Sequence, residues 1–235
     1  MINENIASAF GMPEITVITD YSITDELAQQ CHNMGGVTFY ADIVVDPEVY
    51  KNKFYAIPDF CFVFMHKATK QPIGYFIILP LTESAILRYM DNKLLYDTIK
   101  PNDLQEIQDE QLYNLFFDSM VLTKQYQTSN MARLLFTLLA NVIIERARRF
   151  SFCNYVLIDQ YKDFEKAICD RLNAKFLRTI TYTNGRQGRL YGTKFDYTIF
   201  QKLPNYPAMQ FAYNNKTADE VLLKTKDLWG THCRK

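Results

Sequence analysis

One stretch of the sequence, residues 115–149, constrains the fold more than any other. It opens with an apolar run over residues 115–122, which predicts a buried strand, and continues into a polar loop at residues 123–129. A helix follows at once, because apolar side chains recur at helical spacing on one face. These side chains belong to Met131, Leu134, Leu135, Leu138, Val142 and Ile143. A strand, a tight loop and a helix in this order predict a strand-to-helix crossover in an α/β core.

The start of this helix also has the chemistry of an anion site. The first helical turn carries backbone N–H groups that lack intrahelical acceptors, and it lies at the positive end of the helix dipole, so a phosphate group can bind there. Thr128 or Ser129 can cap the helix. The predicted diphosphate cradle consists of Gln127, Thr128, Ser129, Asn130, Met131, Ala132 and Arg133. An ordinary crossover helix without a ligand is the alternative interpretation of the same residues.

The charge balance bears on the partners of the chain. Its 235 residues include 26 lysines and arginines against 26 aspartates and glutamates, so no net charge favours nucleic acid or an anionic membrane. We therefore expect no nucleic-acid partner. No signal peptide is visible, and the apolar runs are shorter than the ~20 residues that a membrane span needs. The sequence thus predicts a cytoplasmic protein without a membrane partner.

The cysteines and histidines give no sign of a metal site. The five cysteines are odd in number and form no Cys-x-x-Cys pair, which favours reduced thiols over a disulfide framework. The three histidines form no zinc-binding pattern with them, so we expect no metal.

The remaining apolar segments predict one mixed α/β sheet. Strands are expected at residues 15–19, 60–65, 73–79, 115–122, 155–159, 176–182 and 197–203. Helices are expected from residue 24 to a stop at Gly35 and Gly36, near Glu48, and at residues 84–95, 129–149 and 163–172. Antiparallel pairs come first and last in this order, with right-handed crossovers between them. A loop at residues 183–193 separates the last two strands.

Two segments extend this core. Residues 80–111 form a long excursion between two strands, with a second short helix after Lys100 and Pro101. Such an insertion can be a lid, a pocket wall or a surface decoration, and the sequence leaves these alternatives open. Residues 204–235 form a C-terminal extension with one predicted helix at residues 217–228.

The order of elements, together with the loop Gln127-Thr128-Ser129-Asn130-Met131-Ala132, resembles the GNAT superfamily of acetyl-CoA-dependent N-acetyltransferases. The family's loop has Arg or Gln first, Gly fourth, and Gly or Ala sixth. Here Gln127 and Ala132 agree with that pattern, and Asn130 stands where the first glycine is usual. A second stretch, residues 167–176, is similar to the family's fourth helix and its turn into the sixth strand. The resemblance covers residues 15–203 and implies an acetyltransferase-like domain in residues 1–203.

The resemblance implies a GNAT-like fold and acetyl-CoA as cosubstrate. In such enzymes the fourth and fifth strands splay apart, and the pantetheine arm lies between them and bonds to backbone groups as an added strand would. Carried over to this chain, Met120, Val121 and Leu122 supply those backbone groups. The N–H groups of residues 127–133 hold the diphosphate, and Arg133 adds a charge contact.

The implied reaction is direct attack of a primary amine on the acetyl thioester. Asp118 is the candidate base, because it is the only acid inside the apolar run; the alternative is a strand residue on a polar face or an acid that holds a loop. Cys169 stands where the family often has a tyrosine that protonates the leaving thiolate, and its alternative role is packing as a small apolar group. Tyr161 is a candidate substitute, and Lys162 replaces an asparagine often found nearby.

The predicted function is therefore an N-acetyltransferase. Its acceptor is the amine of a small molecule or of a protein, and residues 80–111 and 183–193 are expected to flank the acceptor. The sequence also allows a homodimer. Two other functions stay open, namely a non-catalytic acyl-CoA-binding or interaction module of the same fold and a transferase for longer acyl groups.

Overall fold

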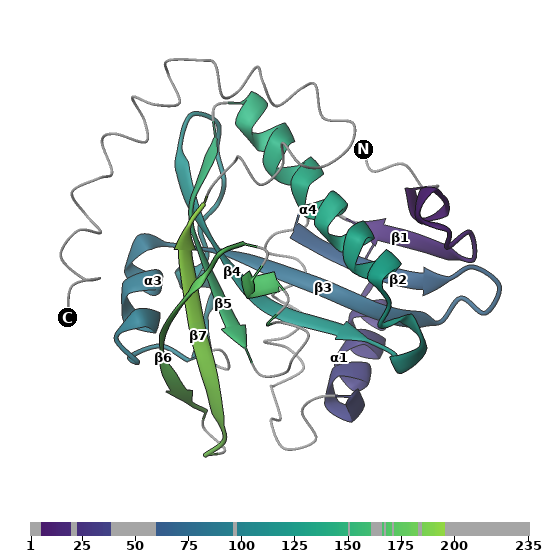
Figure 1. Ribbon diagram of the computed structural model, residues 1–235, viewed down its shortest axis with the longest axis horizontal. Helices are drawn as coiled ribbons and strands as arrows, with labels where there is room; N and C mark the ends of the chain where they lie inside the picture. The colour runs from purple at the N-terminus through teal and green to yellow at the C-terminus, as the bar shows by residue number, and fades with distance from the viewer. Residues whose placement is uncertain are drawn as a thin grey trace.

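A seven-stranded mixed sheet runs through the described part of the chain. The computed structural model describes residues 6–19, 23–38, 60–95, 98–149, 151–160, 166, 168–170, 172–182 and 185–195. The strands are β1 (Ile15–Thr19), β2 (Cys61–His66), β3 (Pro72–Leu81), β4 (Leu112–Leu122), β5 (Phe152–Gln160), β6 (Lys175–Thr181) and β7 (Gln187–Lys194). They lie in the order β1-β2-β3-β4-β5-β7-β6 (Figure 1). The predicted mixed α/β architecture is confirmed.

The sheet has an antiparallel part at each end and one parallel pair in the middle. β1, β2, β3 and β4 are joined as antiparallel neighbours. The chain then crosses through α4 (Ser129–Arg148) to β5, which runs parallel to β4. β7 pairs antiparallel with β5, and β6 pairs antiparallel with β7 at the edge. The predicted order, antiparallel at the start and the end around a central crossover, is confirmed.

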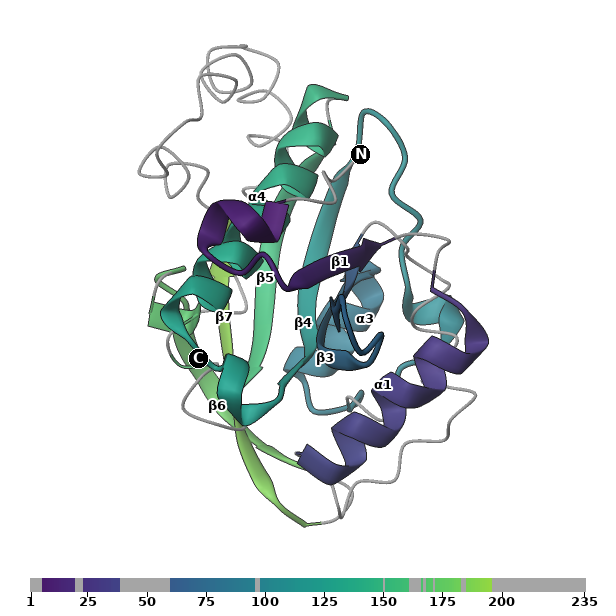
Figure 2. The same ribbon diagram turned by 90° about the vertical axis from the view of Figure 1, so that its right-hand side faces the viewer.

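Helices cover both faces of this sheet. Figure 2 shows α4 on one face, which we call the α4 face, and α1 (Asp25–Thr38) and α3 (Glu83–Met90) on the opposite face, which we call the α3 face. The short 3-10 helix η1 (Ile6–Phe10) precedes β1 and packs against α4. In the described residues no helix combines the length and the apolar character that a membrane crossing requires.

The core lies between α4, the sheet and the two helices behind it. All residues of β4 from Tyr113 to Leu122 are buried, so both faces of this central strand are covered. The apolar face of α4 is buried as predicted at Met131, Leu134, Leu135, Leu138 and Ile143, whereas Val142 is only partly buried. The four described cysteines, Cys31, Cys61, Cys153 and Cys169, are buried thiols.

The predicted stop of the first helix at Gly35 and Gly36 is wrong, because α1 continues to Thr38. A Cβ atom on Gly35 would lie 2.4 Å from the hydroxyl oxygen of Tyr75 on β3. Gly35 therefore permits close packing of helix and strand and does not end the helix.

The predicted loop at residues 183–193 is also wrong over most of its length. Residues 187–194 form β7, and Gly188 and Gly192 lie inside this strand. A Cβ atom on Gly188 would lie 2.2 Å from the Tyr182 hydroxyl oxygen, and one on Gly192 would lie 2.8 Å from that of Tyr155. These glycines are needed where aromatic rings cross the strand. Residues 197–203, predicted as the last strand, lie outside the described residues.

The excursion after β3 is shorter in helix than predicted. β3 extends to Leu81, and α3 ends at Met90, before the left-handed Asn92 at φ 63°. The second predicted helix is a single 3-10 turn, η5 (Pro101–Asp103), which is tied to α3 by an ion pair between Arg88 and Asp103. The helical start predicted near Glu48 and the extension at residues 204–235 lie outside the described residues.

Candidate active site

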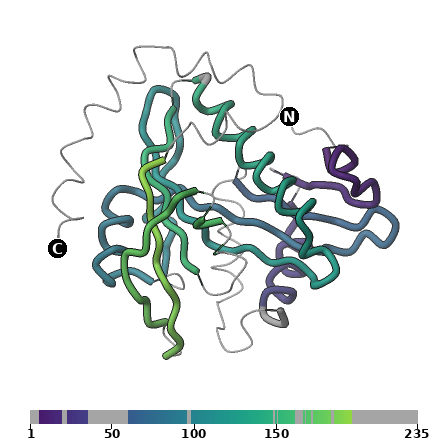
Figure 3. The backbone as a smooth tube through the Cα atoms, in the orientation of Figure 1, coloured from purple at the N-terminus to yellow at the C-terminus, as the bar shows by residue number. Residues whose placement is uncertain are grey.

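The parallel strands β4 and β5 separate part-way along their length. Their pairing runs from Leu112 and Phe152 to Phe117 and Ile158 and ends there. Beyond this point β4 continues along β3 through residues 119–122, whereas β5 continues along β7 through residues 159 and 160. The trace in Figure 3 follows the two strands as they diverge toward their carboxyl ends. We call this divergence the strand split, and it confirms the splayed pair implied by the resemblance.

A bulge in β4 accompanies the start of the split. Ile77 of β3 is opposite Ser119, but the next residue, Ile78, is opposite Phe117. Asp118 is therefore the extra residue of a β-bulge. Because a bulge bends its strand and increases the local twist, it turns β4 away from β5 at the residue where their pairing ends.

The backbone of β4 presents polar groups toward the split. The N–H of Thr123 donates to the carbonyl of Ile73 at 2.9 Å, which makes Leu122 and Gly74 a non-hydrogen-bonded pair of the antiparallel ladder. The N–H and C=O of Leu122 therefore point away from β3. Since the pattern alternates, those of Met120 point the same way, toward the split.

Val121 differs from its two neighbours in this respect. A Cβ atom on Gly74 of β3 would lie 2.5 Å from the Val121 carbonyl oxygen, so this carbonyl faces β3. Of the three residues predicted to bond the pantetheine arm, Met120 and Leu122 thus have their backbone groups directed at the split.

The first turn of α4 contains two amides that the helix does not use. Thr128 caps the helix with extended backbone (φ −115°, ψ 162°), and its hydroxyl oxygen accepts from the N–H of Met131 at 3.2 Å. Its carbonyl accepts from the N–H of Ala132 at 3.1 Å. Ser129 and Asn130 are the first two helical residues, so their N–H groups have no intrahelical acceptor.

The loop before α4 is held by its own hydrogen bonds. The N–H of Gln127 donates to the carbonyl of Lys124 at 3.2 Å, and that of Thr128 donates to the carbonyl of Tyr126 at 2.8 Å. The side-chain amide of Gln127 donates to the carbonyl of Leu122 at 2.9 Å. Gln127 therefore ties the loop to the end of β4. Of the residues in the predicted cradle, Ser129 and Asn130 therefore keep an N–H group that the loop and the helix do not use. The exposed side chain of Arg133 lies one turn further along the helix.

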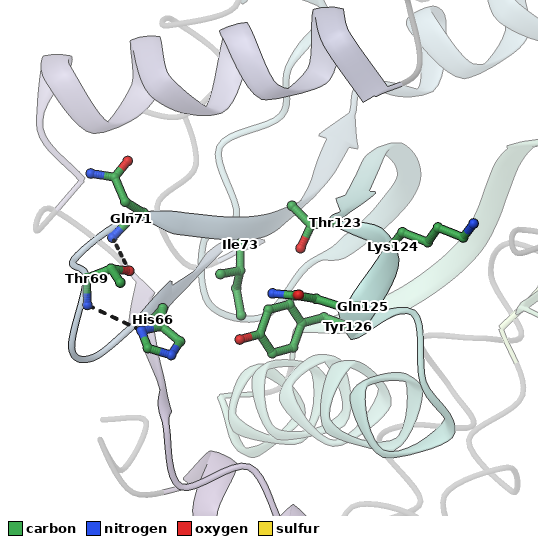
Figure 4. A pocket seen from close by; sticks show the side chains of 8 residues that line it. All are labelled: His66, Thr69, Gln71, Ile73, Thr123, Lys124, Gln125 and Tyr126. Atoms are coloured by element: carbon green, nitrogen blue, oxygen red, sulfur yellow. Dashed lines mark hydrogen bonds between the residues drawn. The ribbon is translucent and has the colours of Figure 1, made fainter.

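An open hollow of about 720 Å³ lies beside this loop on the β3 side of β4 (Figure 4). It is lined by His66, Thr69, Gln71, Ile73, Thr123, Lys124, Gln125 and Tyr126. The Tyr126 hydroxyl points across it toward the His66 ring, whose Nδ1 accepts from the N–H of Thr69 at 3.3 Å. Because its lining comes from the β2–β3 turn and the loop after β4, this hollow is separate from the strand split.

Asp118 lies at the start of the split and is only 6 % exposed. Its charge acts on Tyr89 of α3, whose ring packs on the Phe116 ring at 4.7 Å between centroids, so this carboxyl group lies on the α3 face. One carboxylate oxygen of Asp118 accepts from the Ser119 hydroxyl at 2.9 Å. The predicted base is therefore placed beside the split, and its role stays a prediction.

A second carboxyl group, which the sequence did not single out, lies next to the split on β5. Asp159 accepts hydrogen bonds from the hydroxyl of Tyr89 at 2.9 Å and from the hydroxyl of Tyr182, which follows β6. The pKa of Asp159 is raised from 3.8 to about 6, because burial and, to a smaller extent, the charge of Asp118 outweigh the two tyrosine hydrogen bonds and the charge of Arg178, which lower it. Burial and the Asp159 charge together raise the pKa of Tyr89 well above its ordinary value.

The tyrosines of this network are positioned by other residues. Tyr182 can cross β7 because Gly188 has no side chain. Arg178 of β6 donates to the side-chain oxygen of Asn92 at 2.7 Å and to the carbonyl of Tyr89, which links the edge of the sheet to the end of α3. The only sequence signal for Asp159 was an acid at the end of a buried strand.

Of the other two predicted catalytic residues, Cys169 and Tyr161, the structure describes only Cys169. Cys169 is 1 % exposed, and its carbonyl accepts from the N–H of Ala174 at 2.8 Å. Asn173 adopts the left-handed conformation, with φ 53°, in the turn that leads from Cys169 into β6. Tyr161 lies outside the described residues. The role of Cys169 stays a prediction, and its burial is equally compatible with packing.

Comparison with known proteins gives likenesses of structure only. No family model and no curated protein matches the sequence. Among solved structures, mosquito arylalkylamine N-acetyltransferase like 5b is 11 % identical, with 77 % of this chain and 100 % of that chain covered and a TM-score of 0.47. The NatB acetyltransferase complex bound to a bisubstrate inhibitor is 7 % identical, with coverages of 77 % and 90 % and a TM-score of 0.49. A GNAT-family acetyltransferase from Bacillus anthracis is 8 % identical, with coverages of 77 % and 95 % and a TM-score of 0.42. With TM-scores below 0.5, these likenesses carry no conclusion about activity, which we draw from the geometry of the chain itself.

Proposed function

We propose that this chain is an N-acetyltransferase of the GNAT type, which moves an acetyl group from acetyl-CoA to a primary amine by direct attack. The observation that carries the proposal is the strand split, where the pairing of β4 with β5 ends at Phe117 and Ile158 while β4 runs on toward the start of α4. An extended ligand can occupy such a place as an added strand, with an anion at the helix N-terminus.

The backbone groups at the split support recognition of the pantetheine arm. This arm contains two amide groups, and the C=O of Met120 and the N–H of Leu122 face it along one edge of β4, which leaves the N–H of Met120 for the thioester oxygen. The carbonyl of Leu122 is already bonded to Gln127. The N–H groups of Ser129 and Asn130 would then hold the diphosphate, with Arg133 close enough along the helix to add its charge.

The chemistry follows from where the thioester would lie. The amine nitrogen bonds to the thioester carbonyl carbon, and the carbonyl oxygen gains negative charge, which the backbone N–H of Met120 can stabilise. The carbon–sulfur bond then breaks and CoA leaves as a thiolate. The nitrogen must also lose a proton, and Asp118 and Asp159 flank the start of the split where that proton is released.

The two faces of the sheet divide these tasks. The start of α4 belongs to the α4 face, so acetyl-CoA would enter there, and the amine would arrive from the α3 face, where both carboxyl groups lie. The insertion at residues 80–111 supplies Tyr89 to this second face. This supports the interpretation of that insertion as a wall of the acceptor site.

Acetyl-CoA binding is tested by a matched pair of variants at the first residue of α4. A ligand at 100 times its Kd stabilises the folded chain by about 2.7 kcal/mol, so acetyl-CoA should raise the Tm of the unsubstituted protein by several degrees. Ser129→Pro removes one N–H from the cradle, and a helix accepts proline at this position after an extended residue such as Thr128. We expect the Kd to rise about 10- to 100-fold in Ser129→Pro, since a hydrogen bond to a charged group is lost, and to stay unchanged in Ser129→Ala, which keeps the N–H.

Each result separates the alternatives. A Tm that acetyl-CoA leaves unchanged would remove the proposal altogether. If the Kd for acetyl-CoA is the same in Ser129→Pro as in the unsubstituted protein, the diphosphate does not bind at the N-terminus of α4. Release of CoA thiol in the presence of tyramine, spermidine or a peptide with a free N-terminus distinguishes an enzyme from a binding module. A series of longer acyl-CoA donors tests the acetyl group itself.

A further inference from the structure

Asp159 occupies a defined position at the start of the strand split. Ile158 is the last residue of β5 that pairs with β4, and Asp159 is the next residue along the strand. Asp118 follows Phe117 in the same way on β4. One carboxyl group therefore stands on each strand at the point of separation. The hydrogen bond from Tyr89 of α3 places the carboxyl group of Asp159 on the α3 face, where the amine would arrive.

Two tyrosine hydroxyl groups fix the orientation of this carboxyl group. Tyr89, which is 0 % exposed, donates to one oxygen, and Tyr182 donates to the other. An ionised carboxylate offers about four acceptor positions, so each oxygen keeps capacity for a proton from a substrate. The two tyrosine hydroxyl groups therefore orient the carboxyl group of Asp159 and leave it able to accept a proton.

The charged and titratable groups around Asp159 come from β4, α3, β6 and the turn that follows β6. Asp118 of β4 disfavours the carboxylate, whereas Tyr182, Tyr89 of α3 and Arg178 of β6 favour it. With burial as the largest cause, the pKa of Asp159 is about 6. At neutral pH the group is then mostly ionised and is a stronger base than an exposed aspartate, which suits a general base.

We propose that Asp159 is the general base of the transfer reaction and that Tyr89 and Tyr182 are its positioning residues. This inference rests on the proposed acyl transfer to an amine. The neutral amine nitrogen bonds to the acetyl carbon, the carbon–sulfur bond breaks, and the proton lost by nitrogen goes to the Asp159 carboxylate. CoA leaves as a thiolate and takes up a proton from solvent, and Asp159 returns its own proton to solvent, so the step balances.

Asp118 has a different part in this arrangement. Its carboxylate accepts the neighbouring Ser119 hydroxyl and belongs to the bulge of β4. Its charge acts on Asp159 across the split and disfavours a second negative charge there. Asp118 is thus a positioning residue that tunes the base on the opposite strand.

The pH dependence of kcat/KM tests this assignment. With acetyl-CoA and the best amine of the panel above, log kcat/KM should rise with slope two below about pH 6 and slope one above it, because both Asp159 and the amine must lose a proton. Asp159→Asn should show slope one throughout. It should also lose about 10²–10⁴-fold in kcat/KM at pH 8, which is the range of a general base, while the Tm shift with acetyl-CoA stays unchanged.

Two further variants should move the pH at which the slope changes from two to one, in opposite directions. We call the steeper part of the profile below this pH the acidic limb, or simply the limb. Tyr182→Phe removes a hydrogen bond that favours the carboxylate, so the limb should move to higher pH. Asp118→Asn removes a charge that disfavours it, so the limb should move to lower pH. Tyr191→Phe, which removes a tyrosine hydroxyl from β7 outside this network, should leave the limb in place and serves as the matched control.

The outcomes separate this inference from the proposed function. Turnover with an unchanged limb in Asp159→Asn would overturn Asp159 as the base and leave the transferase proposal standing. Limbs that move in the same direction in Tyr182→Phe and Asp118→Asn would assign the titration to another group. If the unsubstituted protein binds acetyl-CoA but releases no CoA thiol with any amine of the panel, the proposed transfer fails and Asp159 as its base fails with it.

Discussion

The two sides of the strand split are built in different ways. On the α4 side the polar groups are backbone N–H and C=O groups from one continuous segment, which includes Met120, Leu122, Ser129 and Asn130. On the α3 side they are side chains from separate segments, among them Tyr89, Asp118, Asp159 and Tyr182. Backbone groups do not depend on the identity of the side chain, so the asparagine at position 130 leaves the N–H groups of this turn in place. Side-chain chemistry depends on every element that positions it.

The largest expected effect comes from disturbing the α3 side without touching a carboxyl group. A Cβ atom on Gly188 would lie 2.2 Å from the Tyr182 hydroxyl oxygen and under 3 Å from two ring atoms, so Gly188→Ala must displace this ring from Asp159. Because a displacement of about 1 Å near the chemistry can lower the rate 10²-fold, we expect kcat/KM to fall by about that factor. The Kd for acetyl-CoA, measured by titration, should not change.

A double-mutant cycle gives the control for this prediction. Tyr182→Ala removes the ring that the new methyl group would strike, so Gly188→Ala should have little further effect in that background. Equal losses in both backgrounds would show that Gly188 acts through the strand and not through Tyr182. A parallel loss of acetyl-CoA affinity would show that the two sides of the split are not independent.

The second prediction concerns how the free energy of unfolding depends on pH through Asp159 on the α3 side. The pKa of Asp159 is raised from 3.8 to about 6 on folding, so the folded state binds this proton more tightly than the unfolded state does. The resulting stabilisation is present at low pH and is lost as pH rises from about 4 to 7, which corresponds to about 2 kcal/mol in the free energy of unfolding. Asp159→Asn lacks this loss. Urea denaturation should therefore show the variant gaining about 2 kcal/mol relative to the unsubstituted protein between pH 4 and pH 7.

If the free energies of unfolding of Asp159→Asn and of the unsubstituted protein differ by a constant amount from pH 4 to pH 7, Asp159 does not titrate in this range. The matching measurement on the other side of the split uses Ser129→Ala, which changes no titratable group. Its stability relative to the unsubstituted protein should be independent of pH. The contrast identifies the α3 side as the one where function opposes stability, as is typical of groups with perturbed pKa values in active sites.

This contrast also explains what the sequence could predict. The strand, the loop and the capped helix of the α4 side are adjacent in sequence, so hydrophobic period and capping residues locate them together. The hydrogen-bonded group of Tyr89, Asp159 and Tyr182 has no such signal, because only the tertiary fold brings these residues into contact. Tyr89 lies in the insertion whose role the sequence left open.

The glycines were misinterpreted for a related reason. Gly35, Gly188 and Gly192 look like ends of elements in a sequence, where glycine often ends a helix or forms a turn. In the structure each lies inside a helix or strand and makes room for a tyrosine ring or hydroxyl from another element. The aromatic partner, which is distant in sequence, decides between the two interpretations.

A third prediction tests the cap on the α4 side. Thr128 accepts a hydrogen bond from the N–H of Met131, and loss of such a cap destabilises a protein by about 1 kcal/mol. Thr128→Ala should lower the free energy of unfolding by this amount in urea denaturation, and Thr128→Ser, which keeps the hydroxyl, should not. If both substitutions destabilise equally, the threonine methyl group and not the cap accounts for the loss.

The smallest expected effect concerns Gln127, whose side chain joins the end of β4 to the loop before α4, the two elements proposed to bind acetyl-CoA. Gln127→Ala should have two opposing consequences. First, the loop before Ser129 and Asn130 loses the hydrogen bond that ties it to β4, so we expect the diphosphate to bind more weakly. Second, the Leu122 carbonyl loses its donor and becomes available as one more acceptor for the pantetheine arm. The net change in the Kd for acetyl-CoA should therefore be a weakening of only about two- to fivefold.

A fragment of the ligand separates these two consequences. Acetyl-pantetheine lacks the diphosphate, so Gln127→Ala should bind it as well as the unsubstituted protein or more tightly, whereas acetyl-CoA should bind more weakly. Gln125→Ala, in the same loop and exposed, is the matched control and should change neither affinity. Isothermal titration with both ligands measures the sign of each effect. If both ligands lost affinity equally in Gln127→Ala, Gln127 would act on the whole α4 side as one unit, and the division between an arm-binding strand and a phosphate-binding helix would not hold.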